Sequence, residues 1–252
     1  VEGAFYHIKY MIEGTDEYLE VATTRPETLF GDTAVAVNPD DERYTDLVGK
    51  EVELPLTDRT IPIIADPYVD KEFGTGVVKI TPAHDPNDFE VGKRHNLPEI
   101  NILNDDATIN NLGGKYAGMD RYEARKAMVA DLDALGLLVR VEDHTHNVGT
   151  HDRCKTTVEP MIKQQWFVKM DELIKPAVEG VKKGDIELIP ASMDKTYYNW
   201  TDNIRDWCIS RQRVWGVPIP IFYNEDGSEI IDYDVMMHVA DLFRKYGSNV
   251  WF

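Results

Sequence analysis

The chain has 252 residues, with 45 acidic and 27 basic side chains, a net charge of −18 and a pI near 4.7. Its 42% hydrophobic and 29% charged residues are typical of a soluble globular protein and exclude a disordered or fibrous one. No apolar run approaches the roughly 18 residues of a membrane helix, and the first residues do not resemble a signal peptide. We therefore expect a cytoplasmic protein with no membrane partner, built as one large domain or two small ones.

The charge and the cysteine content narrow the class further. A strongly acidic chain does not bind nucleic acid over its whole surface, because phosphate contacts need clustered Lys and Arg. The two cysteines, Cys154 and Cys208, are too few for a disulfide framework and fit a reducing compartment.

The first half of the chain predicts short strands separated by turn residues. β-Branched and aromatic residues are frequent in six segments, at 5–12, 18–23, 33–37, 51–54, 60–65 and 76–80. Two short helices are predicted, over 40–48 and from Pro86, where Asp85 can cap the helix. The pattern predicts an α+β fold whose first part is β-barrel-like with peripheral helices.

The second half predicts more helix. Apolar residues recur at helical spacing over 120–135, and a strand follows over 137–141. Beyond about residue 155 the sequence becomes rich in tryptophan, with helices predicted over 171–183, 192–200, 203–211 and 233–246 and a strand over 219–223. We predict a β-rich domain at 1–150 and a helix-rich segment at 151–252.

One polar segment follows the strand at 18–23. Residues 22–28 combine three threonines, Arg25 and Glu27, and Pro26 disfavours helix at Arg25, so the strand must end in a turn. The segment is either an ordinary polar turn with a surface ion pair or a hydroxyl-lined rim that orients a polar substrate or a water.

A second segment, at 73–89, carries more chemistry. Gly74 and Gly76 allow a close backbone approach, and the strand after them delivers Lys79 and Thr81 to its end. Asp85 and Asp88 then stand three apart at a predicted helix start, on one face. They either cap the helix or bind a substrate cation such as a free α-ammonium. Calcium binding by this acidic segment is a weaker alternative, because the spacing of an EF-hand is missing.

Metal and nucleophile signatures are sparse. His146, His151 and Cys154 are candidate zinc ligands, but a zinc site normally needs four, so we predict no cofactor. The sequence has no Gly-x-Ser-x-Gly elbow, Walker loop or dinucleotide fingerprint. A hydrolase of this kind would therefore use a positioned water on an already reactive bond.

Three motifs taken together resemble a known family. Thr-Thr-Arg-Pro-Glu-Thr at 23–28, Gly-Thr-Gly at 74–76 and His-Asp-Pro-Asn-Asp-Phe at 84–89 resemble the editing domain of class I aminoacyl-tRNA synthetases for branched aliphatic amino acids. Within that family the sequence is most similar to the valyl type. The similarity continues through 31–37, 61–66, 118–121, 158–160, 165–168 and 203–212.

The end of the chain departs from the valyl pattern. Residues 213–223 and 246–252 resemble the isoleucyl enzymes instead, and Trp215, Trp251 and Phe252 are candidate contacts to a synthetase core. The activation signatures His-Ile-Gly-His and Lys-Met-Ser-Lys-Ser are both absent. The resemblance implies an editing insertion followed by a segment returning to the core, without activation of amino acids by this chain alone.

The resemblance implies hydrolysis of mischarged Thr-tRNA(Val) after transfer. It makes Asp88, Thr24 and Asp85 the catalytic candidates, with Asp88 on the α-ammonium and Asp85 near the substrate's side-chain hydroxyl. The other candidates would bind substrate, and they are Thr23, Arg25, Glu27, Phe73, Lys79, Thr81 and His84. The expected partners are the 3′ aminoacyl end of tRNA and the rest of the synthetase, and we expect a monomer.

Three alternatives stay open. The domain could clear Val-tRNA(Ile), as an isoleucyl-type editing domain would. It could bind the tRNA end without catalysis, or it could be an acidic metal-binding module. The acidic charge limits tRNA binding to a few nucleotides, with local help from Arg25, Lys79, Lys93 and Arg94.

Overall fold

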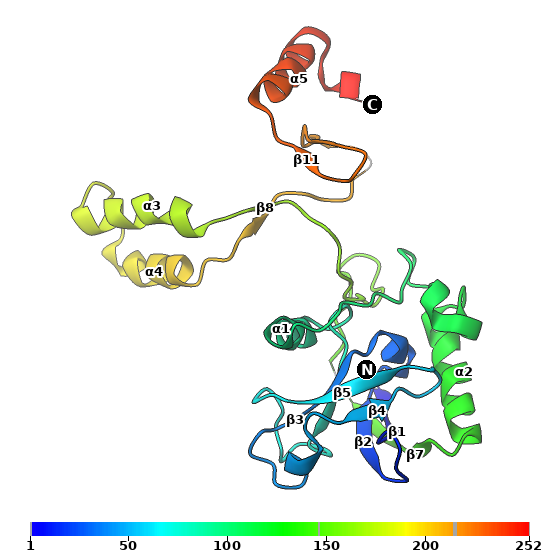
Figure 1. Ribbon diagram of the computed structural model, residues 1–252. Helices are drawn as coiled ribbons and strands as arrows, with labels where there is room; N and C mark the ends of the chain where they lie inside the picture. Colours follow the sequence, from blue (N-terminus) through cyan, green and yellow to red (C-terminus); the bar gives the residue numbers. More distant parts are fainter. Residues whose placement is uncertain (1, 146, 214–215, 252) are drawn as a thin grey trace. The chain divides into compact units, whose positions relative to one another are not determined.

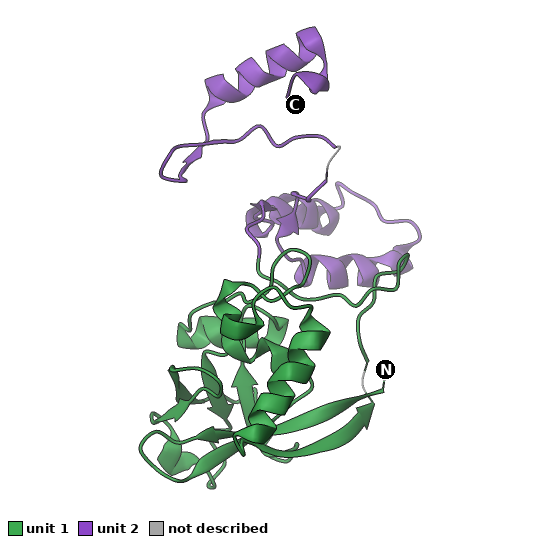
Figure 2. Ribbon diagram, turned by 90° about the vertical axis from the view of Figure 1, so that its right-hand side faces the viewer, with its two compact units in different colours: residues 1–162 green, residues 163–252 purple. Residues whose placement is uncertain are grey.

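The computed structural model describes residues 2–145, 147–213 and 216–251 (Figure 1). They divide into two compact units, Val1–Ile162 and Lys163–Phe252 (Figure 2). His146, Trp215 and Phe252, which the sequence singles out, lie outside the described residues. No helix in the described part of the chain is long and apolar enough to cross a membrane.

The first unit contains two sheets. One has the order β2-β1-β7 and is antiparallel, and the other has the order β4-β5-β3-β6, in which only β3 and β5 run parallel. Their strands are β1 (Glu2–Met11), β2 (Tyr18–Thr23), β3 (Ala34–Val37), β4 (Glu51–Glu53), β5 (Thr60–Ala65), β6 (Val77–Ile80) and β7 (Leu138–Thr145). A bridge between Ile12 and Val52 joins the sheets, and β2 packs against β6. The ends of β2 and β6 are thereby brought together.

Helices and 3-10 turns complete the first unit. They are η1 (Pro26–Gly31), η2 (Thr45–Leu47), α1 (Pro86–His95), η3 (Asn111–Tyr116) and α2 (Arg121–Ala134). α2 packs against η1 and β7, and α1 packs against β6. Ala124, Met128 and Leu132 recur every four residues along α2 and are fully buried, so one stripe of this helix enters the core.

The second unit has short strands and longer helices. They are β8 (Phe167–Val168), α3 (Asp171–Lys183), η4 (Ala191–Met193), α4 (Asp194–Asp202), β9 (Trp207–Cys208), β10 (Phe222–Tyr223), β11 (Glu229–Ile230), α5 (Tyr233–Tyr246) and η5 (Ser248–Trp251). β8 pairs with β9, and β10 pairs with β11. Trp251 packs against the rings of Phe222 and Phe243, with ring centroids 5.6 and 6.2 Å apart.

The α+β class is confirmed, and most predicted elements are present within one or two residues. Two predicted helices are wrong. Residues 203–211 contain β9 instead, because Trp207 and Cys208 pair with β8 and this tertiary contact overrides local helix propensity. Residues 40–48 contain only η2, because the Asp41 carboxylate accepts the Arg43 N–H and forms a local turn.

The burial of α2 yields a stability prediction. Met128→Ala is expected to lower the free energy of unfolding of the first unit by about 2–5 kcal/mol, because it leaves a cavity at a fully buried position. Leu135, just past the helix, is 62% exposed, and Leu135→Ala should change stability by less than about 0.5 kcal/mol. All five tryptophans lie in the second unit, so the measurement is hydrogen exchange of the β1 amides rather than tryptophan fluorescence. Equal effects of the two substitutions would contradict the packing of α2.

Candidate functional site

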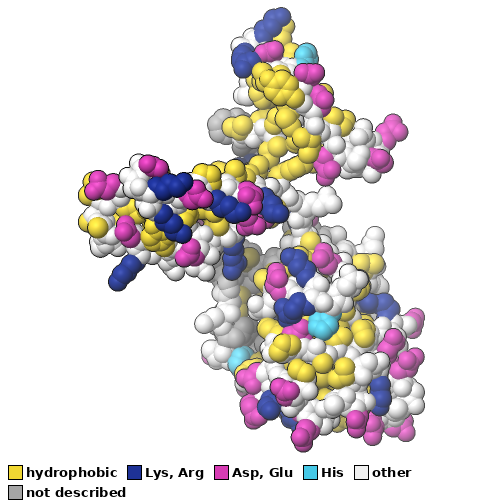
Figure 3. Space-filling view, turned by 60° about the vertical axis from the view of Figure 1, so that its left-hand side comes forward, with side chains coloured by type: hydrophobic (Ala, Val, Ile, Leu, Met, Phe, Trp, Pro, Cys, Tyr) yellow, Lys and Arg dark blue, Asp and Glu magenta, His cyan; other side chains and the backbone are white. Residues whose placement is uncertain are grey.

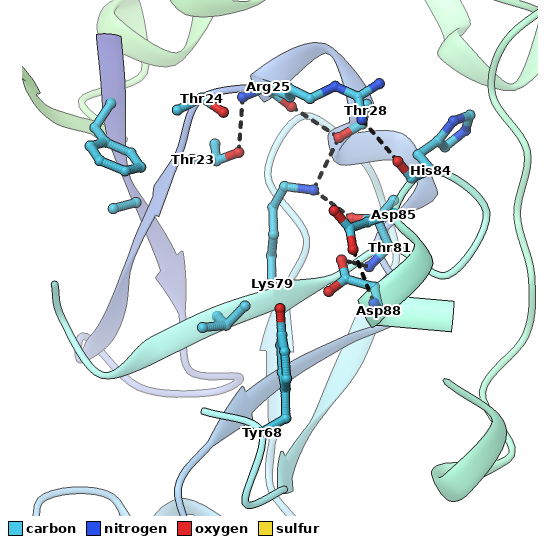
Figure 4. Close-up of a pocket in the computed structure, with 13 residues that line it drawn as sticks. Thr23, Thr24, Arg25, Thr28, Tyr68, Lys79, Thr81, His84, Asp85 and Asp88 are labelled. Carbon is cyan, nitrogen blue, oxygen red and sulfur yellow. Dashed lines mark hydrogen bonds between the residues drawn. The ribbon is translucent and has the colours of Figure 1, made fainter. Parts of the chain in front are cut away.

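A pocket of about 210 Å³ opens where β2 and β6 end (Figure 4). Pro26 begins η1 directly after the end of β2, and α1 begins shortly after the end of β6. These two turns supply most of the lining. Eight of the ten residues proposed from sequence lie in it, namely Thr23, Thr24, Arg25, Lys79, Thr81, His84, Asp85 and Asp88.

Lys79 holds the floor of the pocket together. Its ammonium donates to Asp32 Oδ1 at 2.8 Å, to Thr28 Oγ1 at 3.0 Å and to the Thr81 hydroxyl. Asp32 is fully buried, and its carboxylate also accepts the hydroxyls of Thr81 and Tyr10, each at 2.7 Å. An ammonium has three donors, so these three acceptors use all of them, and the positive charge of Lys79 is matched by Asp32.

Asp88 is a buried carboxylate with no comparable cation of its own. Its side chain lies in the first turn of α1, and the residue is 7% exposed. Oδ2 accepts the Thr81 N–H at 2.9 Å, and no bond to Oδ1 is present among the described residues. Burial raises the pKa of Asp88 to about 6, although Lys79 and the Thr81 N–H partly offset the rise. A cation that enters the pocket would therefore stabilise the ionised form of the Asp88 carboxylate.

Asp85 caps α1. Its Oδ1 accepts the N–H groups of Asn87 at 2.8 Å and of Asp88 at 3.2 Å. The cap fixes the first turn of the helix and therefore the position of the Asp88 carboxylate. The capping interpretation of Asp85 is correct, and the residue also lines the pocket.

The imidazole of His84 is occupied by main-chain groups. Nε2 accepts the Ile102 N–H at 3.0 Å, so the proton sits on Nδ1, which lies 3.3 Å from the Pro160 carbonyl oxygen. Burial, with the nearby charge of Arg25, lowers the pKa of His84 to about 4. The ring points away from Lys79 and Asp88 in Figure 4, so this neutral histidine is not placed to act as a base on a pocket ligand.

Arg25 forms one rim of the pocket. Its Nη1 donates to the His84 carbonyl oxygen at 2.9 Å, and its Nη2 donates to Glu159. The backbone N–H of Arg25 donates to Thr23 Oγ1 at 3.1 Å. A second cavity, of about 350 Å³, shares Thr24 and Arg25 with the first, so Arg25 lines both.

Two proposed residues do not line the pocket. Glu27 is 1% exposed and accepts two hydrogen bonds from Arg125, at 2.8 and 2.7 Å, so it anchors η1 to α2. Phe73 is 67% exposed and lies on the loop before β6. Both residues were expected to bind substrate, and neither is in the lining of the pocket.

Of the residues in the pocket region that were missed, three are polar. Thr28 and Tyr68 line the cavity, and Asp32 balances Lys79 beneath it. Asp32 carried a signal, because it lies two residues before the wholly buried strand β3, and a carboxylate buried there needs a cation. Tyr68 had none, since its position depends on how its loop folds.

The Tyr68 loop and α1 are held by a buried carboxylate. Asp66 is 1% exposed and accepts the Tyr68 N–H at 2.9 Å and two hydrogen bonds from Arg94, and His95 Nε2 lies 2.8 Å from it. Burial alone would raise the pKa of Asp66, but these hydrogen bonds hold it at about 2. Arg94, a candidate for tRNA contact, is thus committed to the fold.

Two of the candidate zinc ligands, His151 and Cys154, lie together, and the third, His146, is outside the described residues. Cys154 Sγ lies 3.3 Å from His151 Nδ1, and the thiol's hydrogen bond to Thr156 and the nearby His151 lower the pKa of Cys154 to about 7. In residues 2–145, 147–213 and 216–251, no group of three His, Cys, Asp or Glu side chains is arranged to hold a metal ion.

The negative charge is concentrated in the first unit. Residues 1–162 carry 31 acidic and 16 basic side chains, a net charge of −15, whereas residues 163–252 carry 14 and 11, a net charge of −3. Figure 3 shows lysine side chains on α3 and α4 of the second unit, interspersed with Asp and Glu side chains. A nucleic acid reaching the pocket would therefore depend on local cations rather than on the field of the first unit.

Comparison with known proteins places the chain among the synthetases. Residues 19–252 match the family described as tRNA synthetases class I (I, L, M and V). The chain is 66% identical over 230 residues to a valine–tRNA ligase of Clostridium perfringens, and the alignment covers 91% of this chain and 26% of that protein. It is 56% identical over 246 residues to a valine–tRNA ligase of Francisella tularensis, covering 97% of this chain and 26% of that protein.

The Francisella match necessarily includes residues 213–223, so the segment that resembles isoleucyl enzymes also aligns with a valine enzyme. A solved complex of LeuRS with tRNA and LeuAMS from Agrobacterium radiobacter is 21% identical, covering 91% of this chain and 24% of that one, with a TM-score of 0.42. The chain spans about a quarter of the length of the curated relatives. Its match over residues 19–252 shows that it belongs to the class I tRNA synthetase family of the I, L, M and V enzymes.

Proposed function

We propose that this chain is the editing part of a valyl-tRNA synthetase, and that its pocket hydrolyses the ester of mischarged Thr-tRNA(Val). The observation that carries the proposal is the buried Asp88 carboxylate in a polar pocket, for which the described residues supply no salt bridge. The high identity to valine–tRNA ligases supports the choice of the valyl type.

The α-ammonium of the attached amino acid is the cation that Asp88 would bind. Burial removes water from this carboxylate and makes its ionised form unfavourable. A bound ammonium would stabilise the ionised form. Asp85 adds a second carboxylate to the lining, and the nearest cation, Lys79, is matched by Asp32. The charge of this part of the pocket therefore suits an ammonium.

The hydroxyl of threonine would be read by the polar floor. Thr28, Lys79 and Thr81 form a hydrogen-bonded group there, and a ligand hydroxyl can exchange bonds with it. The isopropyl group of valine would displace water from these groups without replacing its hydrogen bonds. A synthetic pocket shaped for valine cannot strongly reject threonine, so a second pocket that reads the hydroxyl is needed.

Hydrolysis would use a positioned water. The water oxygen attacks the ester carbonyl carbon, the bond to the ribose oxygen breaks, and that oxygen takes a proton as the amino acid leaves. The ester is already activated, so placing the water and stabilising the developing oxyanion supply much of the rate. Thr24 and Asp85 line the pocket and are the groups we propose to orient the water, because both ring nitrogens of His84 are occupied.

The rest of the synthetase would complete the function. We propose that residues 1–150 form the editing domain, with the two sheets of the first unit as its barrel-like core, and that residues 151–252 connect it to the synthetic core. The tRNA would be held mainly by the missing part of the enzyme, with only its 3′ aminoacyl end in the pocket. The same pocket clearing Val-tRNA(Ile), and one that binds the tRNA end without catalysis, are the alternatives to be separated by experiment.

The role of Asp88 is tested by removing its carboxylate. Asp88→Ala is expected to lower kcat/KM for deacylation of Thr-tRNA(Val) at least 100-fold, because the ammonium loses the buried carboxylate proposed to bind it. Glu90→Gln is the matched control, since Glu90 lies on the same helix but pairs with Lys93 at the surface, and it should retain full activity. Undiminished deacylation by Asp88→Ala would remove Asp88 from the mechanism.

The pKa of Asp88 predicts a pH dependence. Only the ionised carboxylate binds an ammonium, so kcat/KM should fall about tenfold per pH unit below about pH 6 and level off above it. The measurement is a profile from pH 5 to 7.5. In Asp88→Asn this inflection should disappear together with most of the activity, and an unchanged inflection in that variant would assign it to another group.

The raised pKa of Asp88 affects activity and stability in opposite directions as the pH rises. A carboxyl whose pKa is raised on folding favours the folded state at low pH and loses that contribution as the pH rises through about 6. Asp88→Asn at pH 7.5 is therefore expected to unfold at a temperature no lower than the parent chain, because it removes a buried charge. A melting temperature several degrees lower would show that Asp88 is a structural rather than a ligand-binding carboxylate.

Selectivity separates the proposed substrate from its alternatives. The chain should deacylate Thr-tRNA(Val) at least tenfold faster than Val-tRNA(Val) or Val-tRNA(Ile), because only threonine brings a hydroxyl to the polar floor. Equal rates for Thr-tRNA(Val) and Val-tRNA(Val) would refute reading of the hydroxyl, and preference for Val-tRNA(Ile) would favour the isoleucyl type. Binding of a non-hydrolysable aminoacyl-adenosine with no deacylation would leave a tRNA-end-binding module.

A further inference from the structure

Glu159 is a buried carboxylate held between two arginines. Its side chain is 9% exposed, Oε2 accepts a hydrogen bond from Arg25, and Oε1 lies 2.8 Å from Nε of Arg121. Arg121 is itself 8% exposed and begins α2. Glu159 therefore ties the rim of the pocket to a core helix.

The residue after Glu159 reaches the other side of the same rim. The Pro160 carbonyl oxygen lies 3.3 Å from Nδ1 of His84, whose own carbonyl oxygen accepts a hydrogen bond from Arg25. Glu159 and Pro160 thus contact both partners of the Arg25–His84 bond. A segment remote in sequence from both pocket turns fixes how those turns meet.

Opposite charges alternate through this region. The ion pairs run in the order Arg121, Glu159, Arg25, Glu27 and Arg125. Arg25 Nε lies 3.8 Å from Glu27 Oε1, and Arg125 Nη2 lies 2.7 Å from the same oxygen. Each glutamate separates two arginines that would otherwise repel each other. Of the five N–H donors of Arg25, Glu159 and His84 hold one each, which fixes the plane of the guanidinium and leaves donors for a ligand.

We propose that Glu159 is a positioning residue that orients the Arg25 guanidinium toward oxygen atoms of the 3′-terminal nucleotide of the substrate. This rests on the function proposed above. Arg25 lines both cavities, so a nucleotide attached to an amino acid in the first cavity can come within reach of the donors that Glu159 and His84 leave unused. Glu159 does not touch the substrate and acts through Arg25.

Glutamine is the informative replacement at position 159. It keeps the shape of the side chain but has one acceptor oxygen, so it can satisfy Arg25 or Arg121 and must turn its amide donors toward the other. The variant also removes the charge that separates the two guanidinium groups. Arg25 is then expected to lose its fixed orientation while the remaining pocket residues keep theirs.

The test is affinity for an adenosine that carries threonine through a 3′ amide, which the chain cannot readily hydrolyse. Glu159→Gln is expected to raise the Kd about tenfold, and Arg25→Gln by at least as much. The double variant should bind no more weakly than Arg25→Gln alone, because Glu159 acts through Arg25. Glu123→Gln is the control, since Glu123 lies on α2 and pairs with Lys126 at the surface, and its Kd should equal that of the parent chain.

Several results would overturn the proposal. An unchanged Kd in Glu159→Gln, or additive losses in the double variant, would show that Glu159 does not act through Arg25. If Glu159→Gln does not fold, Glu159→Asp keeps the charge on a shorter stem and should raise the Kd several-fold, and an unchanged Kd there has the same meaning. Binding measures this inference and deacylation measures the proposed function, so a chain that binds as expected but does not hydrolyse contradicts only the latter.

Discussion

The pocket depends on the buried ion pair between Lys79 and Asp32. The Asp32 side chain is fully buried, and the Lys79 side chain is 10% exposed. Together they connect β6, the turn before β3, η1 and the Tyr10 hydroxyl. Removing one partner of such a pair leaves an uncompensated buried charge, which costs about 3–5 kcal/mol. The pair therefore holds the ends of several strands in one place, and the substrate candidates Thr28 and Thr81 are positioned as its hydrogen-bond partners.

This pairing also bears on the state of Asp88. Burial raises the pKa of Asp88 to about 6, and Lys79, whose charge is matched by Asp32, only partly offsets that rise, as does the hydrogen bond from the Thr81 N–H. The negative charge of ionised Asp88 would be balanced by the proposed ammonium of the substrate. His84 is neutral, and its ring is held by main-chain groups. This agrees with a proposed mechanism in which the chain positions an activated ester and a water rather than supplying a strong base.

The sequence predicted the residues that line the pocket better than the residues that hold them in place. The turns at 23–28 and 81–88 follow strand ends, and their polar residues were brought together because β2 packs against β6. Asp32 and Glu159 were missed as members of the site because each acts through a contact far along the chain, with Lys79 and Arg25. The helix predicted over 203–211 was wrong for the same reason, since pairing with β8 decides that segment. Local pattern thus identified residues that line the pocket, whereas their long-range partners came only from the fold.

The most direct measurement of the central claim is the pKa of the Asp88 carboxyl, followed by carbon-13 NMR with and without the threonyl 3′-amide of adenosine. The account predicts a pKa of about 6 in the free chain and a fall of at least one unit when the ammonium-bearing ligand binds. The same ligand without its amino group should leave the pKa unchanged or raise it. A pKa that does not fall with the amino-bearing ligand would contradict the claim that Asp88 binds the α-ammonium.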